Sequence, residues 1–474
     1  MPTSMKGLYL VVDLDQTLLK TDILFECFWF SWRQAPRTWL SIHSWKLAPL
    51  KRHLATTCQL DVATLPYNPE VIKYIQTWKA AGGKAALATA TDQLLAEKVA
   101  AHLGLFDAVY GSNGQVNLKG TAKAQFLLKQ FGEKQFVYIG DAAADLPIWA
   151  VAAKAITVNA PPWLRQKVEQ LNPHVEHLGS AKRSIKLYLK EIRPHQWVKN
   201  SLVFVPMLAA HQFNLPTFWS SLVAAVAFSL TASSVYVLND LLDLQADRAH
   251  PRKRHRPFAA GDLPLAHGLW MLFIFLGAGM AIAPTLGWPF LGILLAYYAL
   301  TTAYSFFLKR RIVIDICTLA GLYTIRIFAG AVATGISLSV WLLAFSMFFF
   351  FCLATVKRQA ELVDQQRRNE LKTKGRGYHT EDLPIITMMA LSAGYVSVLV
   401  LALYINSPQV RLLYTRPQVL WGGCAVLLYW LTRTVFLTHR GLMHYDPIVY
   451  AIKDRQSQLC FLICLGLFIL GKSL

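Results

Sequence analysis

The chain has 474 residues, of which 54% are hydrophobic and only 16% are charged. This composition is too apolar for an ordinary soluble protein, so we expect much of the chain to lie in lipid. The net charge of +20 would suit nucleic-acid binding, but the basic residues gather in short loops beside long apolar segments, which favours a membrane protein and no nucleic-acid partner. Seven cysteines without paired spacing argue against a disulfide framework or a zinc site.

Residues 1–178 alternate short β-rich runs with helical stretches, which is typical of a parallel α/β sheet. The runs LYLVVDLD, KAALATA and FVYIGD each end in polar residues. The carboxyl ends of such strands form the ligand crevice, and Asp13, Thr89 and Asp141 fall there. An aromatic-rich, mostly helical insertion at about 22–83 separates the first two runs and predicts a helical cap.

Two acids close the first of these runs. Asp13 and Asp15 are two residues apart on a strand, so their side chains project to the same side, as a nucleophile and its acid/base partner require. Further polar residues follow in order along the chain, namely Thr89, Lys119, Lys123, Gly140, Asp141 and Asp145. In these four ordered motifs the domain resembles the haloacid dehalogenase (HAD) superfamily, whose core is a Rossmann-like parallel sheet with a cap.

The HAD resemblance implies a role for each motif residue. Asp13 would form an aspartyl-phosphate and Asp15 would protonate the leaving group, while Thr89 and Lys123 would hold the phosphoryl oxygens. Mg²⁺ would bind to Asp13, Asp141 and Asp145. Lys119 is a rival for the lysine role, but Lys123 begins the helical pattern AKAQFLLKQF where the family places its lysine. The intact motifs argue against a regulatory remnant, and the substrate of this domain stays open.

After a linker at residues 179–192, apolar stretches lengthen and predict an all-α polytopic membrane domain over residues 193–474. We expect nine spans, at 200–213, 217–240, 265–286, 288–307, 313–333, 338–356, 384–405, 417–437 and 456–472. The N-terminus resembles no secretion signal, and basic residues are concentrated in the loops after the second, fourth, sixth and eighth spans. This asymmetry predicts a bacterial-type inner-membrane protein with its first domain and active sites in the cytosol.

The end of the second span carries the acids that point most directly to a function. Asn239, Asp243 and Asp247 recur every four residues, which puts three oxygen ligands on one face of a helix, with Asp240 about 100° around. Carboxylates are costly at membrane depth unless they bind a cation or line a polar cavity. Mg²⁺ bridging to a diphosphate would meet that condition. We therefore expect these four residues to bind Mg²⁺, with Asp243 and Asp247 taking part in catalysis.

This Asn-Asp-x-x-Asp-x-x-x-Asp motif resembles that of the UbiA superfamily of intramembrane prenyltransferases, which implies nine transmembrane helices around a cavity. One departure is clear. Prenyltransferases carry a second Asp-rich motif, whereas the corresponding stretch here offers Asp315 alone. The neighbouring residues Arg193 to Asn200, Asp247 to Lys253, Tyr304 to Lys309 and Lys357 to Leu362 resemble the branch of polyprenyl-phosphate phosphoribosyltransferases.

This branch implies two phosphorylated substrates, phosphoribosyl pyrophosphate and a polyprenyl phosphate lipid, with Mg²⁺ on the Asp243 face stabilising the departing pyrophosphate. Separate cations would hold the ribose phosphate and the lipid phosphate. Arg326 lies inside the fifth span, where we expect it to pair with Asp315 or with a substrate phosphate. The expected substrate-binding residues are Lys199, Arg248, Lys253, Arg256, Tyr304, Lys309, Asp315, Arg326, Lys357, Arg358 and Glu361.

The leading hypothesis is a bifunctional enzyme that makes a polyprenyl-phosphoryl ribose 5-phosphate and then removes the 5-phosphate in the HAD domain. The main rival is a prenyltransferase that moves an isoprenoid from its diphosphate to an aromatic or other acceptor, with the HAD domain acting on a separate phosphate. A transporter or lipid-binding scaffold is disfavoured because the acids and bases gather at one face and form no midplane pathway. Lipid length, the HAD substrate, a homo-oligomeric state and the organism stay open.

Overall fold

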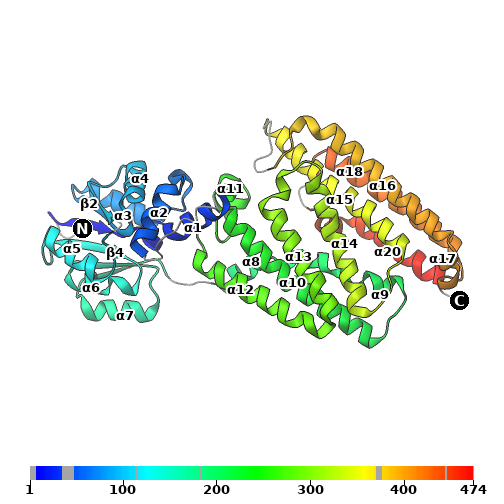
Figure 1. Cartoon of the computed structure of the whole chain (residues 1–474). Helices are drawn as coiled ribbons and strands as arrows, with labels where there is room; N and C mark the ends of the chain where they lie inside the picture. Colours follow the sequence, from blue (N-terminus) through cyan, green and yellow to red (C-terminus); the bar gives the residue numbers. More distant parts are fainter. Residues whose placement is uncertain are drawn as a thin grey trace. The chain divides into compact units, whose positions relative to one another are not determined.

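The computed structural model describes residues 7–34, 47–113, 115–180, 184–369, 376–443 and 446–472. The chain forms two compact units (Figure 1). The first comprises Met1–Ile192 with Val237–Met271, and the second comprises Arg193–Tyr236 with Leu272–Leu474. Parts of the predicted cap and linker, residues 35–46 and 181–183, lie outside the described residues. The predicted domain boundaries at residues 178 and 193 stay predictions.

The first unit is built on a six-stranded parallel sheet with the strand order β3-β2-β1-β4-β5-β6. The strands are β1 (Tyr9–Val12), β2 (Lys84–Asp92), β3 (Ala108–Ser112), β4 (Phe136–Gly140), β5 (Lys154–Val158) and β6 (Val175–Leu178). Val12 pairs with Leu87 of β2 and with Ile139 of β4, so the ends of the three motif-bearing strands lie side by side. The predicted α/β fold is confirmed.

Helices cover both faces of this sheet, because alternate residues of a strand point to opposite sides. Figure 1 shows α3 and α4 on one side of the sheet and α5, α6 and α7 on the other. Leu10 and Val12 join a core with α3 and α4, whereas Val11 joins a second core with α5, α6 and α7. The helices of the first unit are α1 (Ile23–Gln34), α2 (Leu47–Thr57), α3 (Pro69–Ala80), α4 (Gln93–Leu103), α5 (Thr121–Phe131), α6 (Leu146–Val151), α7 (Pro162–Leu171), α8 (Ile185–Ile192) and α11 (Leu244–Ala249). The predicted cap region contributes α1, α2 and α3.

Within the described residues, eight helical segments are long and apolar enough to cross a membrane. They are α10 (Leu215–Leu242), α12 with η8 (Leu265–Leu286), α13 (Trp288–Phe306), α14 (Ile314–Thr334), α15 (Val340–Arg367), η10 with α16 (Thr380–Ile405), η11 with α18 (Pro417–His439) and α20 (Arg455–Lys472). The protein is therefore an integral membrane protein. The cytosolic orientation of its first domain stays a prediction.

The expected count of nine spans is not confirmed, and the difference lies in the first predicted span, residues 200–213. This stretch forms the 3-10 helix η6 (Pro194–Phe204) and the five-residue helix α9 (Val205–Ala209). Residues 200–209 of these two helices rise about 18 Å together, less than the roughly 30 Å of a bilayer core.

Helix α14 is central to the packing of the second unit and contacts α13, α15 and η6. Its neighbour α15 packs in turn against α16 and α18. Charged side chains are buried in this apolar surrounding, among them Asp315 and Arg326 of α14 and Arg358 of α15. Buried charges of this kind must be paired, so these residues mark the polar centre of the unit.

Candidate active sites

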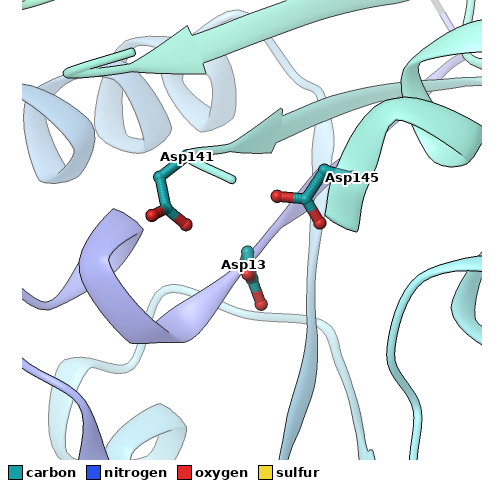
Figure 2. Close-up of side chains that lie close together, drawn as sticks. All are labelled: Asp13, Asp141 and Asp145. Carbon is teal, nitrogen blue, oxygen red and sulfur yellow. The ribbon is translucent and has the colours of Figure 1, made fainter. Parts of the chain in front are cut away.

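The first candidate site lies where β1 and β4 end. Asp13 follows β1, Asp141 follows β4, and Asp145 ends the short 3-10 helix η5 (Ala143–Asp145). One carboxylate oxygen from each residue lies within 4.8 Å of the others, and Figure 2 shows the three side chains converging. Burial, followed by the charge of Asp13, raises the pKa of Asp145 to about 6 and that of Asp141 well above its ordinary value. A divalent cation would relieve this repulsion, so the donor set fits Mg²⁺.

Lys123 contacts the predicted nucleophile directly. It lies in the first turn of α5, and its Nζ donates to Asp13 Oδ1 at 2.8 Å and to the Tyr138 hydroxyl at 3.0 Å. Tyr138 donates in turn to Asp145 Oδ1 at 3.0 Å. Burial opposes the charge on Lys123, but the carboxylates of Asp13 and Asp145 outweigh burial and hold its pKa above the ordinary value. Lys119, the rival lysine, also lines the cavity.

Asp15 is held in the position of an acid/base group. Its Oδ2 accepts a hydrogen bond from Thr91 Oγ1 at 2.6 Å, and its Oδ1 accepts one from the backbone N–H of Ile23 at 2.8 Å. Burial, followed by the charge of Asp22, raises the pKa of Asp15 to about 7. A carboxyl group with a pKa near neutrality is suited to donate a proton at cellular pH.

The cavity in front of these acids has a volume of about 260 Å³ and includes residues that the sequence reasoning missed. Its lining contains Thr91, whereas Thr89 is fully buried and its hydroxyl accepts a hydrogen bond from the N–H of Thr91 at 3.0 Å. Thr91 was detectable, because it is two residues from Thr89 on one strand. Lys51 of the cap helix α2 also lines the cavity, and its Nζ donates to Ala90 O at 2.7 Å and to Asn117 Oδ1 at 3.1 Å. No motif pointed to Lys51.

The second candidate site begins with residues 239–247, here called the Asp-rich segment. Helix α10 ends at Leu242 and α11 begins at Leu244. The N–H of Asp243 still donates to Asn239 O at 2.9 Å, and the N–H of Asp247 donates to Asp243 O at 2.8 Å. The four-residue spacing inferred from the sequence therefore persists across the break between the helices.

Each carboxylate of the Asp-rich segment contacts an arginine. Arg256 NH1 lies 2.9 Å from Asp240 Oδ1 and 2.5 Å from Asp247 Oδ2. Asp243 Oδ1 lies 3.1 Å from NH1 of Arg33. Because one nitrogen reaches both Asp240 and Asp247, these two carboxylates face a common point that a divalent cation would also suit. Within the described residues, however, only Asp13, Asp141 and Asp145 form a compact three-carboxylate group.

Arg248 and Lys253, two further basic residues near the Asp-rich segment, lie in different surroundings from each other. Arg248 forms a two-point ion pair with Glu26, at 2.6 and 3.0 Å, and its Nε donates to Ala259 O at 2.9 Å. Lys253 begins the exposed 3-10 helix η7 (Lys253–His255). The structure thus places Arg256 beside the predicted metal ligands and Arg248 against the first domain's helix α1.

A buried acid–base cluster in the second unit centres on Asp446, which the sequence reasoning missed. Its Oδ2 accepts from Lys199 Nζ at 2.7 Å, from Lys357 Nζ at 3.2 Å and from the Tyr323 hydroxyl at 3.4 Å. Asp446 also caps α19 (Pro447–Lys453) through the N–H of Ile448. An Asp before a Pro is a helix-start signal, but nothing in the sequence connects it to lysines so far away.

A second cluster surrounds Asp315, the single acid of the stretch in which the sequence resemblance led us to look for a second Asp-rich motif. Asp315 Oδ2 lies 2.7 Å from Arg358 NH2, and its Oδ1 lies 3.2 Å from Arg376 NH1. The Tyr304 hydroxyl donates to Asp315 at 2.8 Å, and Glu361 pairs with both arginines. Asp315 and Arg358 are fully buried, so the site is a charge-balanced network with basic groups in the place of a second metal site.

Arg326 does not make the expected pair with Asp315. Its Nε donates to Asn200 Oδ1 at 2.8 Å, its NH2 donates to the Tyr297 hydroxyl at 3.0 Å, and its NH1 donates to Leu322 O. The guanidinium is satisfied by neutral oxygens, because Asp315 and Arg326 lie on the same helix α14, about 16 Å apart along its axis, which is too far for a direct pair. The other part of that expectation, contact with a substrate phosphate, stays a prediction. Lys309 lies half-buried in η9 (Leu308–Arg310).

Two family models match this sequence. The model of the UbiA prenyltransferase family matches residues 201–441, which includes the Asp-rich segment and the Asp315 network. The chain belongs to the UbiA prenyltransferase family. The model of haloacid dehalogenase-like hydrolases matches residues 46–149, so this UbiA protein carries an N-terminal HAD-like domain. That match begins after Asp13 but contains Thr89, Lys123, Asp141 and Asp145.

Three relatives illustrate how this UbiA protein compares with others. An uncharacterised protein of Sinorhizobium fredii is 37% identical over 95% of this chain and 89% of its own length. The nodulation protein NoeC of Azorhizobium caulinodans is 38% identical over 61% of this chain and 95% of its own. The decaprenyl-phosphate phosphoribosyltransferase of Mycolicibacterium smegmatis is 31% identical over 61% of this chain and 93% of its own.

Proposed function

We propose that this UbiA-family protein transfers phosphoribose from phosphoribosyl pyrophosphate to a polyprenyl phosphate, and that its HAD-like domain then removes the 5-phosphate. The observation that carries the proposal is the network at Asp315, where Arg358 and Arg376 gather at a stretch that lacks a second Asp-rich motif and are held by Asp315 and Glu361. A reaction between two phosphorylated substrates requires more positive charge than prenyl transfer does. The similarity to phosphoribosyltransferases supports the same substrate class.

In the transfer step, an oxygen of the lipid phosphate attacks C1 of the ribose. The bond between C1 and the pyrophosphate oxygen breaks, and pyrophosphate leaves with the electron pair. Asn239, Asp240, Asp243 and Asp247 would hold Mg²⁺, which neutralises charge on pyrophosphate when bound. The side chains proposed to hold the two substrates are Lys199, Lys253, Arg256, Tyr304, Lys309, Arg326, Lys357 and Arg358. The lysines next to Asp446, of which Lys199 is buried and Lys357 is partly exposed, form a basic pair suited to one phosphate.

In the hydrolysis step, a carboxylate oxygen of Asp13 attacks the 5-phosphate of the lipid-linked product. The ribose O5 leaves with a proton from Asp15, which the hydrogen bonds from Thr91 and Ile23 hold in place. Lys123 lies at the nucleophile and would stabilise the phosphoryl oxygens. Water then hydrolyses the aspartyl-phosphate, with Asp15 accepting its proton. Asp13, Asp141 and Asp145 would hold the Mg²⁺ of this domain.

We further propose that both sites face the cytosol, where a water-soluble diphosphate substrate is available. The lipid phosphate would reach the transferase from the membrane, and the fused HAD-like domain would receive the phosphorylated product. No nucleic acid takes part in either step. The chemistry is complete within one chain, so a homo-oligomer is not required.

The family match itself favours one alternative, a prenyltransferase acting on a prenyl diphosphate. Ligand-induced stabilisation separates the two, because a ligand that binds only the native state raises the unfolding temperature. With Mg²⁺ present, phosphoribosyl pyrophosphate should raise the unfolding temperature of the membrane domain more than geranyl diphosphate does. The opposite order would favour the prenyltransferase.

A further inference from the structure

Helix α1 of the first unit connects two sets of functional residues. At its start, Asp22 lines the HAD-like cavity, and the N–H of Ile23 donates to Asp15 Oδ1 at 2.8 Å. The same helix carries Glu26 and Arg33, and both contact residues in or next to the Asp-rich segment. A 12-residue helix therefore touches the predicted acid of one reaction and the predicted metal ligands of the other.

The contact between Glu26 and Arg248 is buried, and both carboxylate oxygens of Glu26 take part in it. Arg248 NH2 and NH1 lie 2.6 and 3.0 Å from the two carboxylate oxygens of Glu26, and the Thr21 hydroxyl donates to the same carboxylate at 2.6 Å. The side chains of Glu26 and Arg248 are 1% and 4% exposed. Arg248 Nε is held by Ala259 O. A buried two-point pair of this kind fixes orientation, and removing one partner leaves an uncompensated charge.

The contact at Arg33 lies at the break between α10 and α11. Its NH1 lies 3.1 Å from Asp243 Oδ1 and donates to Leu242 O at 3.1 Å. The guanidinium therefore holds both a predicted metal ligand and the last carbonyl of α10. Arg33 and Asp243 remain partly exposed, at 21% and 24%, so this pair is open to exchange with a cation.

We propose that helix α1 positions the Asp-rich segment, with Glu26 acting through Arg248 and Arg33 acting through Asp243. Arg248 is then a positioning residue, because Nε, NH1 and NH2 are all occupied by protein oxygens. The HAD-like domain thus has a second task beside its own chemistry, which is to hold the metal ligands of the transferase in place. This inference rests on the proposed function only for the role of Mg²⁺ at the Asp-rich segment.

Hydrogen exchange of the full-length protein in lipid nanodiscs tests the proposal with Mg²⁺ alone as the ligand. In the unmodified protein, added Mg²⁺ should slow exchange of the amides at residues 239–249. Glu26→Gln should speed exchange there, because Arg248, the neighbour of the predicted ligand Asp247, loses its buried partner. The Mg²⁺ concentration needed for protection should rise by about tenfold, the lower end of the 10–100-fold loss seen when groups that orient metal ligands are removed. Glu169→Gln is a matched control, because Glu169 pairs with His177 and is 57% exposed.

Arg33→Gln provides a second variant in case Glu26→Gln loosens the whole first unit. Its partly exposed pair is not needed for packing, so the protein should fold. Loss of the contacts to Asp243 and to Leu242 O should speed amide exchange at residues 239–249 before Mg²⁺ is added. Unchanged exchange at residues 239–249 in a folded Glu26→Gln protein and in Arg33→Gln would overturn the proposal, as would an equal change in Glu169→Gln. Because no phosphoribosyl substrate is used, failure of the proposed transfer reaction would leave this outcome unaffected.

Discussion

The acids of the HAD-like cavity and the acid of helix α14 have opposite surroundings. In the cavity, Asp13, Asp141 and Asp145 converge, and Lys123 contacts Asp13 alone among them. In α14, one carboxylate, Asp315, is matched by two arginines. The first arrangement has excess negative charge and suits a cation. The second is charge-balanced, because Glu361 also pairs with both arginines. Under the proposed function, one chain would use a metal at the first site and basic side chains at the second.

The largest expected effect comes from removing the nucleophile of the cavity. Asp13→Asn should lower phosphate release on the order of 10⁴-fold, because an amide of similar shape cannot attack phosphorus. The variant should still transfer ribose and accumulate the lipid-linked ribose 5-phosphate, which mass spectrometry of the extracted lipid detects by its extra phosphate. If the unmodified enzyme also stops at the 5-phosphate, the HAD-like domain serves another substrate.

A substitution in the buried network around Asp315 should lower the stability of the protein. Asp315→Asn removes one of the two carboxylate partners of the buried Arg358 guanidinium and leaves Glu361, so we expect the free energy of unfolding to fall by about 3 kcal/mol. Denaturant unfolding in detergent measures the change. Asp364→Asn is the control, because Asp364 and Arg368 form an exposed pair and its loss should cost under about 1 kcal/mol. If the two variants lose the same unfolding free energy, the buried pair at Asp315 contributes no more to stability than the exposed pair at Asp364.

Substitutions in the Asp-rich segment should lower the transferase activity with little change in folding. Asp243→Asn and Asp247→Asn should each slow ribose transfer by about 10²–10³-fold, since an amide is a poorer Mg²⁺ ligand and charge on pyrophosphate would be less well stabilised. Initial rates with labelled phosphoribosyl pyrophosphate give the measurement. Removal of divalent cations with a chelator should abolish transfer in the unmodified enzyme. Normal turnover in either variant, or after chelation, would contradict the metal assignment.

The smallest effect is expected at the cap. Lys51→Gln removes the charged contacts to Ala90 O and Asn117 beside the cavity. We expect the KM for a sugar phosphate to rise roughly tenfold, because Lys51 lines the cavity and a charged hydrogen bond from it to the substrate phosphate would contribute about 1.5–3 kcal/mol. Phosphate-release kinetics on ribose 5-phosphate measure this change. A KM that stays the same would leave Lys51 as a structural contact between the cap and β2.

The sequence predicted local features well. Strand ends at Asp13 and Asp141 followed from apolar runs that stop in polar residues, and the spacing within the Asp-rich segment followed from helical periodicity. The first predicted span is not confirmed, and an apolar stretch of this length does not reveal that η6 and α9 divide it. Hydropathy records how apolar a segment is and carries little information about where a short helix ends.

Long-range pairing could not be predicted. Asp315 and Arg376 are 61 positions apart, and Lys199 and Asp446 are 247 apart, so no local pattern relates them. Arg326 was expected to pair with Asp315 because an intramembrane arginine requires a partner. Arg326 does have hydrogen-bond partners, as this requirement predicts, but they are Asn200 and Tyr297. A charge requirement predicts that a partner exists, and only the fold decides which residue it is.

The most direct test of the central claim supplies the unmodified enzyme with Mg²⁺, labelled phosphoribosyl pyrophosphate and a polyprenyl phosphate. Mass spectrometry of the extracted lipid should find polyprenyl-phosphoryl ribose without a 5-phosphate, together with equal amounts of pyrophosphate and inorganic phosphate. A lipid that carries no ribose, while a prenyl diphosphate donates its prenyl group to an acceptor in the same preparation, would contradict the account.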